Sequence, residues 1–496
     1  MTLVAVLVLF TVLVAAGVRA PTDSRGSSPI FSAYVIVVIG FALYTALPAL
    51  LTLAVGDYTW APQYYSEEAF SHAVWTCVFA LIIFLYAYNI AQSRIWTKDP
   101  DDKSRPLLND RFKSTAQDPI VVVFLALGIL IKLYLITKAG GLDSLVRLSG
   151  FGRKFSGQEA ISTADIRLFT ISGIADGAAT WGLLGAFKSR NRQNLWLAVF
   201  FATLLLSYFI LGKRLVLLLP LICAGVGFHV YRRALTTRLL PIALTASIVL
   251  GFGSILARVF LPAIIGGYSI DYSKTAYAEG SLVKLYLYSG EYSSLEMISV
   301  VLESRRELVD LFGGTWKTLV STNLDPFLYT IPRALWPSKP DRVHDFGYAL
   351  SSTLGATSFD DPTVGYASTV IGTSLAAGFL GLIIAMLALG VCAAAIDASL
   401  RHRAWSELRV VLFSLGIVFV FYLVRQGSPG WAFIISVVQN YGVIGSLLIL
   451  AYRAKGKASS AKSDTSAMSR RLPARNGKGT DRPTVDDSYR RAANDS

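Results

Sequence analysis

Basic side chains recur where the apolar runs of this sequence are interrupted, and together they could bind a phosphate group. Lys213 and Arg214 are adjacent in LSYFILGKRLVLLLP, Arg425 lies in FYLVRQGSPGWAF, and IPRALWPSKPD holds Arg333 and Lys339. A guanidinium fork matches two phosphate oxygens at once, and a lysine ammonium adds a point charge. These five cations predict an anion site if the fold gathers them. The alternative is separate anchoring of each cation to lipid headgroups.

The IPRALWPSKPD stretch, residues 331–341, has the composition of a rigid loop. Its prolines fix the backbone and keep the residue before each of them out of a helix. Trp336 is expected to anchor the loop at the membrane interface or to stack on a sugar ring. Asp341 adds an anion beside the two cations. We expect the loop to present Arg333 and Lys339 to a phosphate; the alternative is a structural loop docked on the helices.

A transfer reaction at such a site also needs a general base that deprotonates an attacking hydroxyl. The candidates in this part of the chain are Glu291, Asp341, His344, Asp360 and Asp361. His344 has the most suitable ordinary pKa, although a single loop histidine is more often a surface residue, so the base stays unassigned. Asp360 and Asp361 are adjacent rather than spaced as in a metal-binding DxD motif. The sequence therefore predicts chemistry without a metal or another cofactor.

Membrane-spanning helices must position these residues. Of 496 residues, 53% are hydrophobic and 16% are charged, whereas soluble proteins carry about 25% charged residues. A helix needs about 20 apolar residues to cross the hydrocarbon. The sequence predicts an all-α polytopic membrane protein with about 11 spans: 3–18, 30–55, 73–91, 119–137, 168–187, 195–211, 215–230, 239–263, 367–396, 410–423 and 431–452.

Lysine and arginine in the loops predict the orientation of these spans. Residues 92–118 carry six and the tail from Arg453 carries eleven, whereas residues 56–72 carry none. This predicts an N-terminus outside and a C-terminus in the cytoplasm, and a first span is favoured over a cleaved signal because basic residues follow the first run. The loop 138–167 departs from the pattern with five: either a span is miscounted or these cations bind something anionic.

Four parts follow from this pattern. Residues 1–263 hold the first eight spans, 264–366 a large external loop, 367–452 the last three spans, and 453–496 a polar tail expected to be disordered. Within the loop, Ser293-Ser294-Leu295-Glu296 has the pattern of a capping box, and Gly313-Gly314 would end the helix. We expect an amphipathic helix that lies on the membrane or over the bundle, with Glu296 as a cap.

Ionisable residues inside spans are costly and usually face a cavity or a partner. Asp176 lies near the middle of FTISGIADGAATWG and predicts either a functional group or an ion pair. Lys132 and Arg258 lie toward the outer ends of their spans, where they could also snorkel to the interface.

Two other classes of site are excluded by composition. The net charge of +14 comes mainly from loops and the tail, so it signals topology rather than nucleic-acid binding. The cysteines Cys77, Cys223 and Cys392 all lie in apolar runs, so they predict neither a disulfide framework nor a metal site.

Several features in order resemble one family. They are a span ending in GKR, a long external loop, IPRALWPSKPD, a Gly-rich apolar segment (VGYASTVIGTSLAAGFLGLIIAMLALG) and a short hairpin with an arginine. Together, over residues 195–450, they resemble the oligosaccharide repeat-unit polymerases, the Wzy-type O-antigen or exopolysaccharide polymerases of bacterial inner membranes. The most specific element is the pattern at Pro332–Pro340.

The resemblance implies a membrane glycosyltransferase of the GT-C type with its large loop in the periplasm. Such an enzyme joins repeat units carried on undecaprenyl diphosphate, which is the leaving group. The importance of external arginines in the family carries over to Arg214, Arg333 and Arg425. The implied partners are undecaprenyl-diphosphate-linked oligosaccharides, membrane lipids, a chain-length regulator and a flippase. Further candidates for substrate contact are Lys213, Lys339, Trp336, Asp341, Arg258 and Asp176.

Three rival functions stay open at this point. An O-antigen ligase-like transferase would share the fold, the donor and the arginines. A flippase or transporter for lipid-linked sugars is favoured by Asp176, but paired halves, which are common in transporters, are not visible in the sequence. A membrane scaffold would leave the external cations unexplained.

Overall fold

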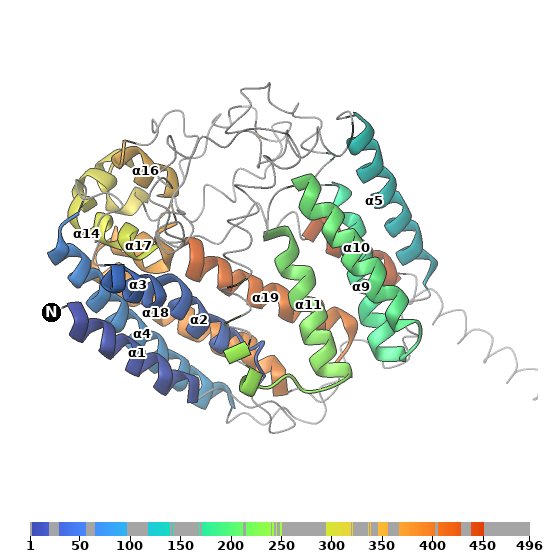
Figure 1. Ribbon diagram of the computed structural model, residues 1–496, viewed down its shortest axis with the longest axis horizontal. Helices are drawn as coiled ribbons and strands as arrows, with labels where there is room; N and C mark the ends of the chain where they lie inside the picture. The colour runs from blue at the N-terminus through green and yellow to red at the C-terminus, as the bar shows by residue number, and fades with distance from the viewer. Residues whose placement is uncertain are drawn as a thin grey trace, which may run out of the picture. The chain divides into compact units, whose positions relative to one another are not determined.

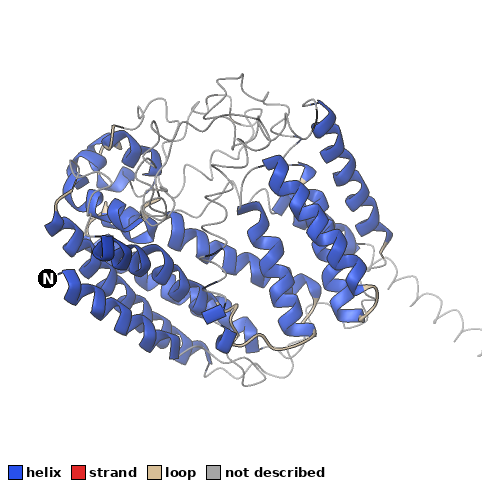
Figure 2. Cartoon of the chain, viewed as in Figure 1, coloured by secondary structure: helices blue, strands red, loops and turns tan. Residues whose placement is uncertain are grey.

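The computed structural model describes residues 2–18, 29–55, 65–96, 118–138, 171–211, 215–239, 294–318, 346–355, 367–401, 405–427 and 438–450, with a few single residues between them. The structural statements below concern these residues. All their regular elements are helices, and pairing of β type is limited to one isolated bridge between Pro29 and Thr236 (Figure 2). The predicted all-α class is thereby confirmed.

Most of the helices lie in the predicted apolar runs, and Figure 1 labels the longer ones. In chain order they are α1 Thr2–Val18, α2 Ala33–Phe41, the π-helix η1 Ala42–Ala46, α3 Leu47–Val55, α4 Glu67–Trp96, α5 Pro119–Lys138, α9 Ile174–Ser189, α10 Gln193–Leu211, α11 Leu215–Tyr231, η3 Thr237–Leu239, α14 Ser294–Leu311, α16 Phe346–Thr353, α17 Thr369–Leu375, α18 Phe379–Ala398, η5 Ser399–Arg401, α19 Glu407–Gln426 and the π-helix η6 Val438–Gly442.

The protein is embedded in a membrane. In the described ranges, five helical segments are long and apolar enough to cross a bilayer: Ala33–Ala54, Glu67–Ile95, Pro119–Lys138, Phe379–Ala398 and Glu407–Gln426. Shorter apolar helices occupy four more of the predicted spans, at Thr2–Gly17, Gln193–Tyr208, Leu217–Tyr231 and Asn440–Leu450. The predicted span 239–263 lies almost wholly outside the described residues, so the count of eleven stays a prediction.

Two groups of helices pack within the compact unit Met1–Ser446. In the first, α4 lies along α18 and also contacts α1 and α14; in the second, α9 contacts α5, α10, α11 and η6. Helix α2 contacts α18 and α1 of the first group, and helix α19 touches both α2 and, in the second group, α11. Small residues allow the closest approaches: a Cβ at Gly390 of α18 would lie 2.9 Å from the Phe84 carbonyl oxygen of α4.

The predicted span 367–396 is not one helix, which corrects the sequence-based prediction. α17 ends at Leu375, and α18 begins at Phe379 after Gly378, whose φ of +89° suits only glycine well. The freed carbonyl of Ala376 accepts a hydrogen bond from Nε of Arg305 on α14 at 3.0 Å. The carbonyl at the break is thus satisfied within the protein, and α18 alone is long enough to span.

The predicted helix of the large loop is α14. It ends in a Schellman motif, in which Gly313 N–H donates to the Asp310 carbonyl at 2.9 Å and Gly314 N–H to the Val309 carbonyl at 3.0 Å. Its first half is buried against α4, α16 and α17. Of the two predicted positions, the structure therefore selects the one over the bundle. Ser293 lies outside the described residues, so the capping box stays a prediction.

A buried carboxylate joins three helices at the end of α18. Asp397, fully buried, accepts from the backbone N–H groups of Ala33 at 2.7 Å and Tyr34 at 3.0 Å, and from the Tyr88 hydroxyl at 2.9 Å. The two backbone groups are orphan donors at the start of α2, where the helix dipole also favours an anion. Asp397 thus caps α2 from another helix.

Replacing Asp397 by alanine is expected to lower stability by about 3 kcal/mol or more, because each unsatisfied buried donor costs about 1–3 kcal/mol. Thermal unfolding of the purified protein in detergent measures the change. Asp310→Ala, on the exposed part of α14, is the control and should change little. Equal unfolding midpoints for the two variants would contradict the capping role.

Candidate functional site

Three of the ten predicted site residues belong to the described part of the chain: Asp176, Trp336 and Arg425. The other seven lie outside the described residues, so the gathering of the predicted cations stays a prediction. These seven are Arg214, Arg333, His344, Lys213, Lys339, Asp341 and Arg258.

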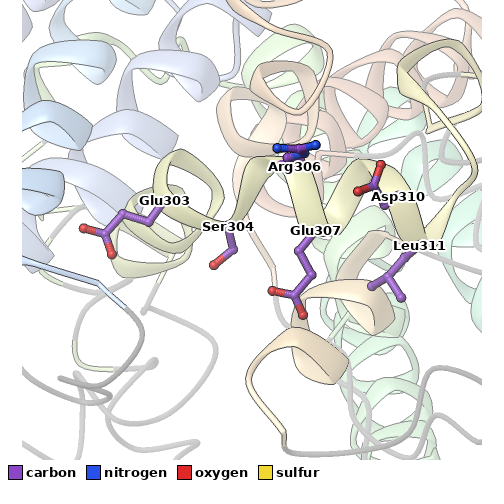
Figure 3. Close-up of a pocket in the computed structure, with 6 residues that line it drawn as sticks. All are labelled: Glu303, Ser304, Arg306, Glu307, Asp310 and Leu311. Carbon is purple, nitrogen blue, oxygen red and sulfur yellow. The ribbon is translucent and has the colours of Figure 1, made fainter.

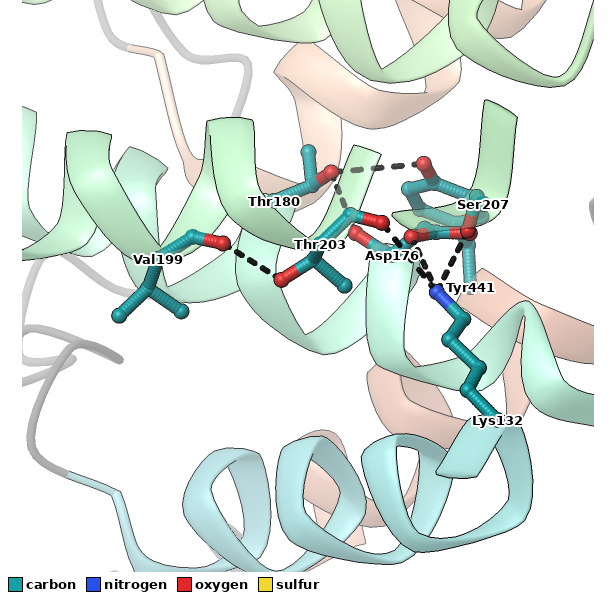
Figure 4. A network of polar contacts seen from close by, with 7 residues as sticks. All are labelled: Lys132, Asp176, Thr180, Val199, Thr203, Ser207 and Tyr441. Carbon is teal, nitrogen blue, oxygen red and sulfur yellow. Dashed lines mark hydrogen bonds and ion pairs between the residues drawn. The ribbon is translucent and has the colours of Figure 1, made fainter. Parts of the chain in front are cut away.

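Asp176 of α9 forms a buried ion pair with Lys132 of α5 (Figure 4). Lys132 Nζ lies 2.8 Å from Asp176 Oδ1, and the two residues are only 1% and 3% exposed. Ser207 of α10 bridges them, accepting from Lys132 at 2.5 Å and donating to Asp176 Oδ2 at 2.6 Å. Three helices are therefore joined by one polar cluster inside an apolar bundle.

The polar network extends from this pair to the π-helix η6. Thr180 Oγ1 donates to the Asp176 carbonyl at 2.7 Å and lies 3.4 Å from the Tyr441 hydroxyl. Gly177 permits the contact between α9 and η6, since a Cβ there would lie 2.5 Å from the Asn440 carbonyl oxygen. π-helical turns are often found at functional sites, but here the turn completes a packed network.

The contacts of this network favour an ion pair over a functional group at Asp176. Both carboxylate oxygens are engaged, one by Lys132 and one by Ser207. The snorkelling alternative for Lys132 was wrong, because its ammonium is buried and held between three helices. Sequence alone places Lys132 and Asp176 forty-four residues apart and carries no signal that pairs them.

Arg425 lies in the last turn of the spanning helix α19. The helix ends at Gly427, which has φ +77° and donates its N–H to the Leu423 carbonyl at 2.9 Å. A Cβ at Gly427 would lie 2.0 Å from Thr373 Oγ1 and 2.3 Å from the Thr369 carbonyl oxygen. The end of α19 that carries Arg425 is therefore pressed directly onto α17.

Helix α17 presents buried hydroxyl groups at this contact. Thr373 Oγ1 donates to the Thr369 carbonyl at 3.1 Å and lies 3.2 Å from Ser368 Oγ. Thr369 has φ +63°, a costly conformation for a β-branched residue, which typically persists where the surroundings demand it. The run ASTVIGTS in the sequence could have signalled this polar segment, but the sequence interpretation treated it as ordinary span.

Besides the polar segment of α17, sequence reasoning also missed Arg305. It lies on α14, and its bond to the Ala376 carbonyl places it at the residue that follows the last residue of α17. The sequence predicted an amphipathic helix here without assigning a role to Arg305.

Trp336 of the proline-bounded loop is half-buried, and its indole N–H donates to Ser338 Oγ at 3.1 Å. The indole N–H is thus bonded within the loop, and the faces of the ring could contact a lipid or a sugar. This contact agrees with either predicted role of Trp336.

Metal ligation has no candidate in the part of the chain described, where no three His, Cys, Asp or Glu side chains are grouped closely enough to hold an ion. Within the described residues, the groups around α17 that could bind a ligand or take part in a reaction are the nearby arginines and the hydroxyls of the helix. No protein-family model, curated protein or solved structure matches the chain, so its function is inferred from its own residues.

Proposed function

We propose that the chain is a membrane glycosyltransferase that polymerises undecaprenyl-diphosphate-linked oligosaccharide repeat units at the periplasmic face of the bacterial inner membrane. The observation that carries this proposal is the PRALWPSKP pattern at Pro332–Pro340, set in the large loop of an all-helical membrane protein.

The proposed reaction breaks the bond between the anomeric carbon of the growing chain and its diphosphate. A hydroxyl of the incoming lipid-linked unit forms the new bond to that carbon, and its proton passes to a general base. Negative charge develops on the departing phosphate oxygens, and fixed arginines stabilise it without a metal. Arg214, Arg333 and Arg425 are proposed for this role, Lys213 and Lys339 for supporting charge, and His344 for the base.

The arrangement around α17 supports this proposal. α17 contacts both α14 of the large loop and α19, whose last turn carries Arg425. A site made jointly by the loop and the Arg425 hairpin needs these two parts to be structurally connected. The polar, tightly packed α17 makes that connection.

The rival functions are distinguished by their products. A ligase-like transferase would use the same donor and make one transfer per chain, whereas a polymerase makes a ladder. The transporter alternative drew on Asp176, and the pairing of Asp176 with Lys132 and Ser207 accounts for that buried charge without a transported substrate.

Arg333→Ala is expected to lower polymerisation by about 10²–10³-fold, the usual loss when one donor to a developing oxyanion is removed. The purified protein would receive a lipid-linked repeat unit, and the products would be resolved on a gel. Lys317→Ala, an exposed cation after α14, is the control. An unchanged ladder with Arg333→Ala would remove Arg333 from the site. Transfer of single units to another acceptor, or movement of intact substrate across vesicles, would contradict polymerisation.

A further inference from the structure

Helix α17 contacts two elements that carry arginines, α14 and α19. At its end, Arg305 of α14 donates from Nε to the Ala376 carbonyl at 3.0 Å. Between Thr369 and Thr373, α17 is in contact with Gly427, which follows Arg425 by two residues. Seven residues of helix extend about 10 Å at a rise of 1.5 Å per residue, so Arg305 and the end of α19 that carries Arg425 both contact one short segment.

The Arg305 guanidinium is oriented but only partly used. Its Nε bond to a main-chain carbonyl fixes the plane of the fork, and the residue as a whole is exposed. Within the described ranges, no other hydrogen bond or ion pair of Arg305 is found. One terminal nitrogen lies 3.2 Å from where a Cβ at Gly378 would be, so the absence of a side chain at this position leaves room beside the fork. A held fork with two remaining amino groups is suited to phosphate oxygens.

The neighbouring Arg306 has a different setting (Figure 3). It lines a groove of about 660 Å³ on α14 together with Glu303, Glu307 and Asp310. Three carboxylates and one guanidinium line that groove, which makes it net negative and disfavours a phosphate there. Of these two adjacent arginines, Arg305 is therefore the one whose surroundings favour an anion.

We infer that Arg305 is a phosphate-binding residue at the α17–α18 break and acts with Arg425 on one bound diphosphate. The identity of the ligand, a diphosphate on a polyprenyl lipid, rests on the proposed function. The same chemistry could come from the headgroup of an anionic phospholipid, so the test separates the two sources.

The test measures binding without turnover. The full chain in phosphatidylcholine nanodiscs is titrated with undecaprenyl diphosphate, for the wild type and for Arg305→Gln, Arg425→Gln and Arg306→Gln. Loss of one charge-assisted contact should weaken binding about 10- to 100-fold for Arg305→Gln and Arg425→Gln, whereas Arg306→Gln should match the wild type. Equal affinities of Arg305→Gln and Arg306→Gln would overturn the inference.

Two further arms keep the result interpretable. Nanodiscs with phosphatidylglycerol test the headgroup source: if Arg305→Gln changes only the binding of that lipid, Arg305 is a membrane anchor and the inference fails. Arg305→Lys keeps a charge that can still reach the Ala376 carbonyl, so it replaces Arg305→Gln if that variant does not fold. It should weaken diphosphate binding relative to Arg306→Lys, because the fork is lost.

The outcomes also separate this inference from the proposed function. If diphosphate binding depends on Arg305 but the protein forms no ladder, polymerisation is refuted and the phosphate site at Arg305 is supported. A polymerisation ladder together with diphosphate binding that ignores Arg305 would refute the site and leave the polymerase.

Discussion

Replacing Lys132 by methionine is expected to destabilise the protein by about 3–5 kcal/mol, the usual cost of removing one partner of a buried ion pair. The change would leave the Asp176 carboxylate charged, or force its protonation, in a setting where it is 3% exposed. The cost arises from the isolated charge rather than from the lost contact. Thermal and denaturant unfolding of the purified protein in detergent would measure it.

The double variant Lys132→Met/Asp176→Leu separates these two causes. It removes both charges and fills the space with apolar groups, so it should recover most of the loss or even exceed the wild-type stability. Lys138→Met, at the exposed end of the same helix α5, is the matched control. If Lys132→Met lowers the unfolding midpoint no more than Lys138→Met does, the pair contributes nothing to stability.

Gly427→Ala is expected to lower the free energy of unfolding by about 2–5 kcal/mol. The left-handed backbone conformation costs an alanine about 1–2 kcal/mol, and overpacking costs about 1–3 kcal/mol more. The new methyl group would overlap Thr373 Oγ1 and the Thr369 carbonyl oxygen, so the end of α19 must move away from α17. Because Arg425 lies in that last turn, polymerisation should fall together with stability. Unfolding midpoints and product ladders would be measured on the same preparations.

Gly17→Ala is the control for this prediction. Gly17 lies in α1 with nothing within 4 Å of its virtual Cβ, so alanine there should be neutral or stabilise by up to about 1 kcal/mol. If the two variants have similar unfolding midpoints, the contact between α19 and α17 does not contribute to stability.

The sequence determined the class of this protein because the requirements for crossing a bilayer can be recognised in short stretches of chain. Runs such as 119–137 predicted α5 almost to the residue, since an apolar run in lipid must satisfy its own backbone as a helix. The end of α14 was also predicted locally, because Gly313-Gly314 indicated where the helix stops, and the structure shows a Schellman motif there. The chemical candidates around IPRALWPSKPD also came from local composition, and they define the proposed polymerase.

Only the tertiary structure decided which polar groups meet. Lys132 and Asp176 each read as isolated charges, and their pairing depends on how α5, α9 and α10 pack. The break before α18 was hidden in an apolar run because its carbonyl is satisfied by Arg305 from the distant helix α14. Long-range contacts of this kind leave no periodic pattern in the sequence. The period of a helix and the length of a span, in contrast, can be recognised from consecutive residues.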